Sequence, residues 1–259
     1  MAFIDHDLHI HTELSSCSRD PEQNAAFLLE YAKTNGLTTI CVTDHFWDET
    51  VPGASNWYKP QKFEHISKIL QLHEAEGIRF LFGCETDMDK YCTIGVSKER
   101  MKALDFIIVP TTHLHMTGFT HRGDEDVAER AELWVKRFEA LLDSDMPFEK
   151  TGIAHLTCGL MYREHHLEVL SAISDEDMIR LFRRSADLGL GIELNFPATR
   201  LTDESRDIML RPYRIAKEEG CRFYLGSDAH HPAEIAKAPA NFAKIVELLE
   251  LDDSHKFVI

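Results

Sequence analysis

The sequence has 259 residues, of which 44% are hydrophobic, enough for one large globular domain or two small ones. Its 28 lysines and arginines are outnumbered by 44 aspartates and glutamates, so the formal net charge is -16 at pH 7. A charge of this sign argues against nucleic acid as a partner, because it repels phosphate backbones. Charges occur within the first seven residues and the longest apolar runs are only strand-sized, so we expect no targeting signal and no membrane span.

Short apolar or β-branched segments alternate with longer segments of helical periodicity, which is typical of βα units in a parallel sheet. Seven strands are predicted, at Asp7–Ile10, Thr38–Val42, Phe80–Gly83, Phe106–Val109, Thr151–Ala154, Gly191–Leu194 and Phe223–Leu225. Helices are predicted at Pro21–Thr34, Lys62–Glu76, Lys98–Ala103, Glu125–Leu142, Asp175–Leu188, Ser205–Glu219 and Asn241–Leu251.

No repeat, low-complexity segment or linker interrupts this alternation, so residues 1–259 are predicted to form a single domain. The fold class is α/β, and one barrel-like domain is the economical architecture. If the sheet closes, the loops that follow the strands converge on one site at the C-terminal rim. The six cysteines form no CxxC pair and a chain of this length needs no disulfides, so we expect free thiols and a cytoplasmic location.

His9 and His11 lie two residues apart on the first predicted strand, so their side chains point the same way and form a chelating pair. Other metal-capable residues lie at or just after the ends of other predicted strands, and these are His45, Glu85, His113, His155, Asp228 and His230. A single histidine near a strand end is usually an ordinary polar or surface group, but a set of this size predicts a metal site. Imidazoles with a few carboxylates suit zinc, iron or manganese.

Eight candidate ligands exceed the three or four that one catalytic metal uses, so we expect two or three divalent ions. A carboxylate such as Glu85 would bridge two of them. Adjacent ions generate a nucleophilic hydroxide near neutral pH and stabilise the attacking and leaving oxygens, as phosphoester hydrolysis requires.

The order of these residues resembles that of the PHP family, named for polymerase and histidinol phosphatase. The matching motifs are DLHIHT at 7–12, TDH at 43–45, GCE at 83–85, His113, His155 and GSDAH at 226–230. They extend over nearly the whole chain, and four motifs in order are far more specific than a single HxH. The resemblance implies a distorted seven-stranded (β/α) TIM-like barrel with a trinuclear metal site and phosphoesterase activity.

By matching positions, the resemblance implies a first ion held by His9, His11, Glu85 and Asp228, a second held by Glu85, His113 and His155, and a third held by His45 and His230. It also places Asp228 and His230 nearest the scissile group, as the catalytic residues. Family members usually have another His or Asp a few residues after the HxH, where this sequence has Cys17. Either the Cys17 thiolate or Asp20 or water would complete the third site.

A phosphatase of negative net charge needs local cations to receive the phosphate. Arg200, which follows the sixth predicted strand, is the first candidate, and histidinol phosphatases of the family resemble this sequence there. Arg163, in the loop after His155, is the second candidate.

The segment Phe46–Tyr58 is rich in turn formers and aromatics, and it is either a lid beside the metals or a surface loop pinned by its aromatics.

These features predict a metal-dependent phosphoesterase that hydrolyses a small phosphomonoester by attack of a metal-bound hydroxide, with L-histidinol phosphate the favoured named substrate.

One alternative is a barrel amidohydrolase, for which eight strands and often a bridging lysine are expected. Another is a phosphodiesterase or nuclease of the same family, although the sequence has no basic stripe that would follow a nucleic acid backbone. A third is a barrel that keeps its metal for structure alone. The sequence does not indicate an oligomeric state.

Overall fold

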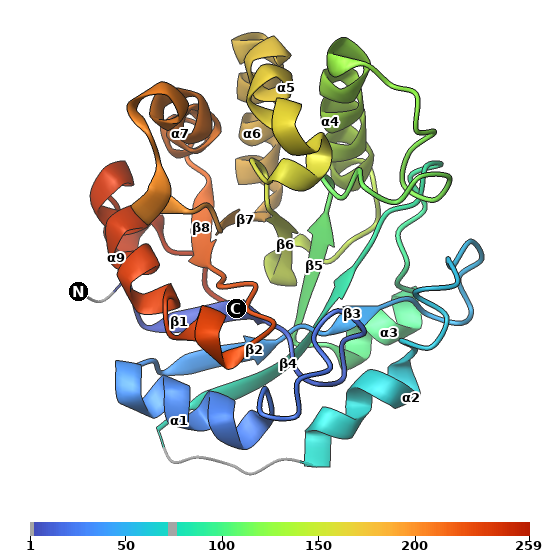
Figure 1. Cartoon of the computed structure of the whole chain (residues 1–259), viewed down its shortest axis with the longest axis vertical. Coiled ribbons are helices and arrows are strands. Elements are labelled where there is room, and N and C mark those ends of the chain that lie inside the picture. Colours follow the sequence, from blue (N-terminus) through green and yellow to red (C-terminus); the bar gives the residue numbers. More distant parts are fainter. Residues whose placement is uncertain (1–2, 72–76) are drawn as a thin grey trace.

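The structure is a computed structural model, and it describes residues 3–71 and 77–259. The strands form one parallel sheet in the order β1-β2-β4-β5-β6-β7-β8, and the short β3 pairs with β4 beside this path. The strands of the path curve into a nearly closed barrel with the helices around its outside (Figure 1). The bounds are β1 His6–Ile10, β2 Thr39–Val42, β3 His45–Phe46, β4 Arg79–Thr86, β5 Phe106–Pro110, β6 Thr151–Ala154, β7 Gly191–Leu194 and β8 Arg222–Leu225. The predicted α/β class and distorted seven-stranded barrel are confirmed.

The helices lie between the strands and after the last one. Their bounds are α1 Ala25–Asn35, α2 Phe63–Ile66, α3 Lys98–Ala103, α4 Val127–Leu142, α5 His166–Ala172, α6 Asp175–Leu188, α7 Asp203–Glu218, α8 Pro232–Ile235 and α9 Ala238–Leu249. Within the described part of the chain, no helix combines the length and apolarity that crossing a bilayer requires. All six cysteines are free thiols, as predicted.

Local side-chain chemistry sets several helix ends. Asn24 accepts a hydrogen bond from the backbone N–H of Phe27, so α1 begins at Ala25 rather than at the predicted Pro21. Asp126 and Glu129 form a reciprocal capping box that starts α4.

The predicted helix Lys62–Glu76 is helical in its described part, but only its first turn is an α-helix. The α-helix ends at Ile66 and continues as a 3₁₀ helix over Ser67–Gln71, while residues 72–76 lie outside the described residues. Ile66 and Ile69 are both buried, and a spacing of three residues lies on one face of a 3₁₀ turn. The sequence analysis also missed α5, which is short, and the two-residue β3 that carries His45.

Two sets of apolar side chains alternate along the strands. On β5, Ile107 and Val109 pack in the large core between sheet and helices, whereas Phe106 and Ile108 belong to a smaller cluster with Tyr224 and Phe257. The alternation indicates that the smaller cluster fills the barrel interior, since successive strand residues point to opposite faces. Side chains therefore close the interior below the C-terminal rim.

The barrel closes between its first and last strands through the segment that follows β8. The backbone N–H of Asp228 donates to the His9 carbonyl oxygen at 2.8 Å, and the N–H of His11 donates to the Ala229 carbonyl oxygen at 3.1 Å. Ile10 and Ala229 form the corresponding parallel bridge. This closure places the first strand and the segment after the last strand side by side at the rim.

Arg137 of α4 joins this helix to the loops that follow β4 and β5. Its side chain is buried, and its guanidinium donates hydrogen bonds of 2.7–3.3 Å to the backbone carbonyl oxygens of Met88, Asp89, Thr111 and Thr120. These loops adjoin the candidate ligands Glu85 and His113. Arg137 therefore fixes part of the rim from outside the barrel.

We expect Arg137→Met to lower the free energy of unfolding by about 3 kcal/mol, because it leaves buried carbonyl oxygens without donors. Lys136→Met on the exposed side of the same helix is the matched control, with an expected change within about 0.5 kcal/mol. Urea unfolding of the chelator-treated proteins, followed by circular dichroism, measures both changes. Equal stability of the two variants would contradict the prediction.

Candidate metal centre

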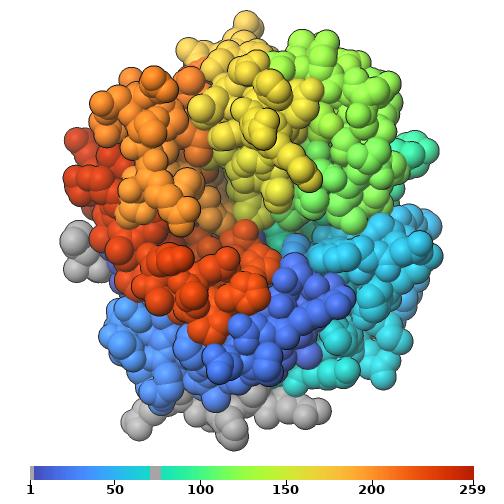
Figure 2. All heavy atoms as spheres, viewed as in Figure 1, coloured from blue at the N-terminus to red at the C-terminus, as the bar shows by residue number. Residues whose placement is uncertain are grey.

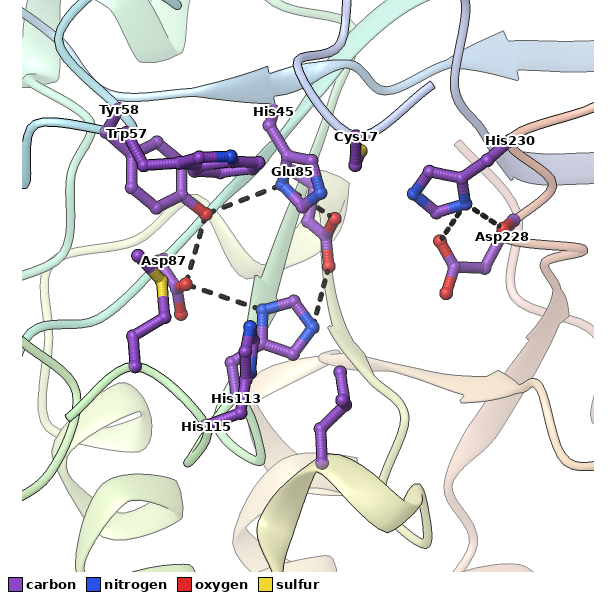
Figure 3. Close-up of a pocket in the computed structure, with 12 residues that line it drawn as sticks. Cys17, His45, Trp57, Tyr58, Glu85, Asp87, His113, His115, Asp228 and His230 are labelled. Carbon is purple, nitrogen blue, oxygen red and sulfur yellow. Dashed lines mark hydrogen bonds and ion pairs between the residues drawn. The ribbon is translucent and has the colours of Figure 1, made fainter. Parts of the chain in front are cut away.

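Every strand of the barrel path contributes a metal-capable side chain at or just beyond its carboxyl end. The side chains that come together there are His9, His11, His45, Glu85, His113, His155, Glu193, Asp228 and His230. All eight candidate ligands predicted from the sequence are in this set, and Glu193 is an addition to it. Figure 3 shows His45, Glu85, His113 and His230 directed toward one space.

The first group consists of His9, His11, Glu85 and Asp228. The two Nε2 atoms are 3.2 Å apart, and each lies 3.0–3.5 Å from Glu85 Oε2 and from Asp228 Oδ1. Four ligands arranged tetrahedrally at zinc distances lie about 3.3 Å from one another. The spacing of this group therefore fits one divalent ion.

The two carboxylates of the first group also face a second group. Glu85 Oε1 lies 3.4 Å from His155 Nε2 and 3.7 Å from His113 Nε2. Asp228 Oδ2 lies 3.3 Å from His155 Nε2. Each carboxylate thus offers one oxygen to each group, so Asp228 joins Glu85 as a candidate bridge.

A third group forms around His11. Its ring lies beside those of His45 and His230, with centroid distances of 4.5 and 4.3 Å. Cys17 joins these three histidines, with ligand atoms within 4.8 Å of one another. Asp20 instead lies 3.3 Å from His231. Of the two residues considered for this position, the structure brings only Cys17 to the group.

Unpaired polar atoms and backbone strain support a metal at this site. Both carboxylate oxygens of Glu85 and both ring nitrogens of His155 are buried without a hydrogen-bond partner among the described residues. Such atoms cost roughly 1–3 kcal/mol each unless something else satisfies them. His155 and Asp228 also have positive φ angles of 49° and 51°, a conformation that L-residues adopt only when the surroundings impose it. The donors present fit divalent transition metals.

The charged groups of the site raise the pKa of His11 and lower the pKa values of Glu85 and Asp228. Burial alone would lower the pKa of His11, but the carboxylates of Asp228 and Glu85 beside its ring outweigh it and raise the pKa to about 9. Burial alone would raise the pKa of Glu85 and of Asp228, but the surrounding histidines hold both well below their ordinary values. Without metal, His11 is therefore a cation at neutral pH, and an ion must displace its proton.

Residues beyond the predicted ligands orient the imidazoles. Ser15 Oγ lies 3.0 Å from His11 Nδ1, receives the backbone N–H of His45, and donates to the buried carboxylate of Asp44 at 2.8 Å. Because this hydroxyl donates to Asp44, it accepts the proton of His11 Nδ1, which leaves Nε2 free for a metal. Asp44 stands directly before His45 in the TDH motif, so the sequence contained a signal for it.

Two further acids face histidines of the site. Asp87 Oδ2 accepts the Tyr58 hydroxyl at 3.0 Å and lies 3.4 Å from His113 Nδ1, and Figure 3 shows this contact. Glu193 Oε1 lies 2.5 Å from His9 Nδ1. Glu193 is the one charged residue in β7, which was the only sequence signal for it.

Two cavities adjoin the metal-capable cluster. The first, of about 450 Å³, is lined by Cys17, His45, Trp57, Tyr58, Glu85, Asp87, His113, His115, Met116, Leu160, Asp228 and His230. The second, of about 760 Å³, also contains Asp228 and His230, together with Asn195, Arg200 and Lys237. The space-filling view shows a hollow between the orange and yellow segments of this face (Figure 2).

The structure separates the two arginines predicted to bind substrate. Arg200 is exposed in the second cavity with the catalytic candidates Asp228 and His230. Arg163 is exposed in a 3₁₀ turn and lines neither cavity. The assignment of both residues to substrate binding stays a prediction.

The segment Phe46–Tyr58, considered as a lid or as a pinned surface loop, is pinned by an aromatic side chain and also lines the first cavity. Trp47 is buried and packs 5.3 Å from the ring of Phe119, which pins the loop. Trp57 and Tyr58 line the first cavity, and the Trp57 ring lies edge-on to His45 at 4.9 Å. The loop thus forms one wall of the cavity.

Comparisons with known proteins agree with this arrangement. The model of one family, the PHP domain, matches residues 7–195. A protein of Caldicellulosiruptor saccharolyticus named a probable phosphatase is 21% identical over 258 residues, covering 99% of this chain and 92% of its own. A probable phosphatase of Caldicellulosiruptor bescii is 23% identical over 236 residues, covering 91% of this chain and 83% of its own.

A solved structure also shares the fold. The histidinol phosphate phosphatase of Lactococcus lactis, crystallised with zinc, L-histidinol and phosphate, matches with a TM-score of 0.56 at 18% sequence identity. The match covers 93% of each chain. At this identity the likeness shows the fold, and the activity has to be argued from the site.

We expect metal affinity to rise with pH, by about tenfold per pH unit for each proton that an ion displaces. His11 titrates near pH 9 without metal, so at least its proton leaves on binding at neutral pH. Between pH 6.5 and 8.5, the logarithm of the Zn²⁺ affinity, measured by chelator competition, should rise with a slope of about one or more. The exposed His165→Gln variant should keep this slope. An affinity independent of pH would contradict the predicted protonation.

Proposed function

This chain belongs to the PHP domain family, and on that premise we propose that it is a metal-dependent phosphatase of small phosphomonoesters. The observation that carries the proposal is the pair of bridging carboxylates, Glu85 and Asp228, each of which faces two groups of histidines. Ligand groups that share carboxylates hold ions close together, as hydrolysis of phosphoesters by paired metals requires. The similarity to two probable phosphatases supports the same reaction class.

We propose that two or three ions of zinc, iron or manganese bind at the three groups. The ligands would be His9, His11, Glu85 and Asp228 for the first, Glu85, His113, His155 and Asp228 for the second, and Cys17 with His45 and His230 for the third. Ions so held supply Lewis acidity toward a phosphoryl oxygen and ionise water near neutral pH.

The chain's own residues would place the phosphate between the two cavities. Asp228 and His230 border both of them, so a phosphoryl group beside these residues is also open to Arg200. His230 Nδ1 is held by the Asp228 carbonyl oxygen at 2.8 Å, which leaves Nε2 for an ion or the substrate. The guanidinium of Arg200 would receive phosphate oxygens that carry charge.

The first cavity suits an alcohol without negative charge. Among its described lining residues are three acids, Glu85, Asp87 and Asp228, but no lysine or arginine. Trp57 adds a flat aromatic wall. Glu85 and Asp228 would be neutralised as metal ligands, but Asp87 lies outside the ligand groups. A second phosphate would therefore meet this acid and no side-chain cation there, whereas a flat or cationic alcohol would not be repelled. L-histidinol phosphate has such an alcohol, and the Lactococcus lactis phosphatase was crystallised with L-histidinol. We propose it as the first substrate to test.

The alternative hydrolases have less support. A barrel amidohydrolase was expected to have eight strands, whereas the path of this sheet has seven and β3 lies beside it. A nuclease of the same family would need a cationic track, and the net charge of -16 argues against one. Both remain outcomes of the substrate test.

The first experiment is phosphate release by metal-loaded protein from a panel of phosphomonoesters and diesters, with histidinol phosphate included and metal content counted by elemental analysis. We expect two or three ions per chain and a preference for monoesters with uncharged or cationic alcohols. His230→Ala should lower kcat by roughly 10²-fold or more. Bound metal with no phosphate release from any ester would exclude the proposal and direct attention to amide substrates or a structural role.

Arg200→Met should raise KM for the preferred phosphomonoester about tenfold with little change in kcat, because a phosphate held in both ground and transition states affects binding alone. Arg163→Met tests the second candidate, and Arg222→Met, at the amino end of β8, is the control. The metal content of each variant should match the wild type. A lowered kcat at unchanged KM in Arg200→Met would assign this residue to the transition state instead.

A further inference from the structure

We infer that Glu193 is a positioning residue, which holds His9 in the tautomer and orientation that a metal ion needs. The inference rests on the proposed metal site and adds to it a residue that lies outside the sequence motifs. Glu193 lies on β7 and is completely buried. A carboxylate in such a place requires partners, since burying an uncompensated charge is costly.

The partners of Glu193 are two candidate ligands. Its Oε1 lies 2.5 Å from His9 Nδ1, and its Oε2 accepts the backbone N–H of His155 at 2.9 Å. An ionised carboxylate can only accept, so His9 Nδ1 carries the proton. His9 Nε2 is then a free lone pair, directed at the space it shares with Glu85 and Asp228.

Glu193 could instead be a ligand of an additional ion, because its oxygen also groups with ring nitrogens of His9 and His155. The contact argues against this. Two ligand atoms that each lie about 2.0 Å from one ion are about 2.8–3.3 Å apart, whereas these two atoms are 2.5 Å apart. The other carboxylate oxygen is already committed to the backbone of His155.

A glycine of the GSDAH motif provides independent support. A Cβ atom on Gly226 would lie 2.3 Å from Glu193 Oε1 and 2.6 Å from the Cβ of His9. Gly226 is not among the residues with positive φ, so its backbone would tolerate a side chain. A glycine is therefore required at position 226, because any side chain there would overlap Glu193 and His9 where they are in contact.

The structure contains a matched pair away from the metal-capable cluster. Glu125 is buried, lies 2.9 Å from His121 Nδ1, and accepts backbone N–H groups of Arg122 and Gly123. Like Glu193 it holds a histidine Nδ1 and backbone N–H groups, but it also pairs with Arg130 at 3.3 Å and belongs to none of the metal-capable groups. Removing it should cost stability without affecting a metal.

The experiment compares Glu193→Ala, Glu193→Gln and Gly226→Ala with the control Glu125→Ala, using Co²⁺ as the probe. We expect Glu193→Ala to weaken Co²⁺ binding about 10–100-fold in a chelator competition, and to shift the visible spectrum of the Co²⁺-loaded protein. Glu193→Gln should fall between Glu193→Ala and wild type, because an amide can accept from only one of the two N–H groups. Gly226→Ala should weaken binding through displacement of both Glu193 and His9, and Glu125→Ala should bind as the wild type does.

The number of ions bound at saturating Co²⁺ separates the two roles. A positioning residue leaves this number unchanged, whereas loss of one ion in Glu193→Ala and Glu193→Gln would make Glu193 a ligand and overturn the inference. Wild-type affinity in these variants, or no binding by the wild type, would also overturn it. If Glu193→Ala does not fold, Glu193→Gln and Gly226→Ala decide the question. These measurements need no substrate, so failure of the phosphatase proposal in the ester panel would be seen separately.

Discussion

Two backbone hydrogen bonds across the barrel seam hold the candidate metal site together. They join Asp228 to His9 and His11 to Ala229, and so connect the first strand with the segment after the last. Because these bonds join backbone atoms, they fix the position of His9 and His11 relative to the GSDAH motif along the barrel axis, independently of side-chain conformation. The first ligand group, which takes residues from both motifs and from β4, exists only once this seam has formed.

The site concentrates charge that the rest of the fold must tolerate. Its carboxylates and histidines stabilise one another's charged forms, which is why the pKa of Glu85 falls and that of His11 rises. The compensation is incomplete, since buried atoms of Glu85 and His155 lack partners and two candidate ligands have left-handed backbones. The packed barrel around the site maintains these conformations, and an ion would satisfy the unpaired atoms.

The two cavities divide the recognition of a phosphomonoester between them. A strongly acidic protein repels phosphate at long range, so attraction has to be local, from bound cations and from Arg200. On the other side, Trp57, Asp87 and the lack of a lysine or arginine among the described lining residues favour an alcohol of low or positive charge.

The sequence by itself determined the seven strands and all eight candidate ligands, because a parallel barrel brings strand ends to one rim and metal-capable residues recurred at those ends. It did not determine the role of Glu193, a single acid in an apolar strand, or the break in the helix after Ile66, where two buried isoleucines are three residues apart. Only the tertiary structure decided that Cys17 rather than Asp20 approaches the histidines, and that Arg200 but not Arg163 shares a cavity with Asp228. Loop conformations settle these choices, and they depend on contacts between residues far apart in the chain, which local patterns do not record.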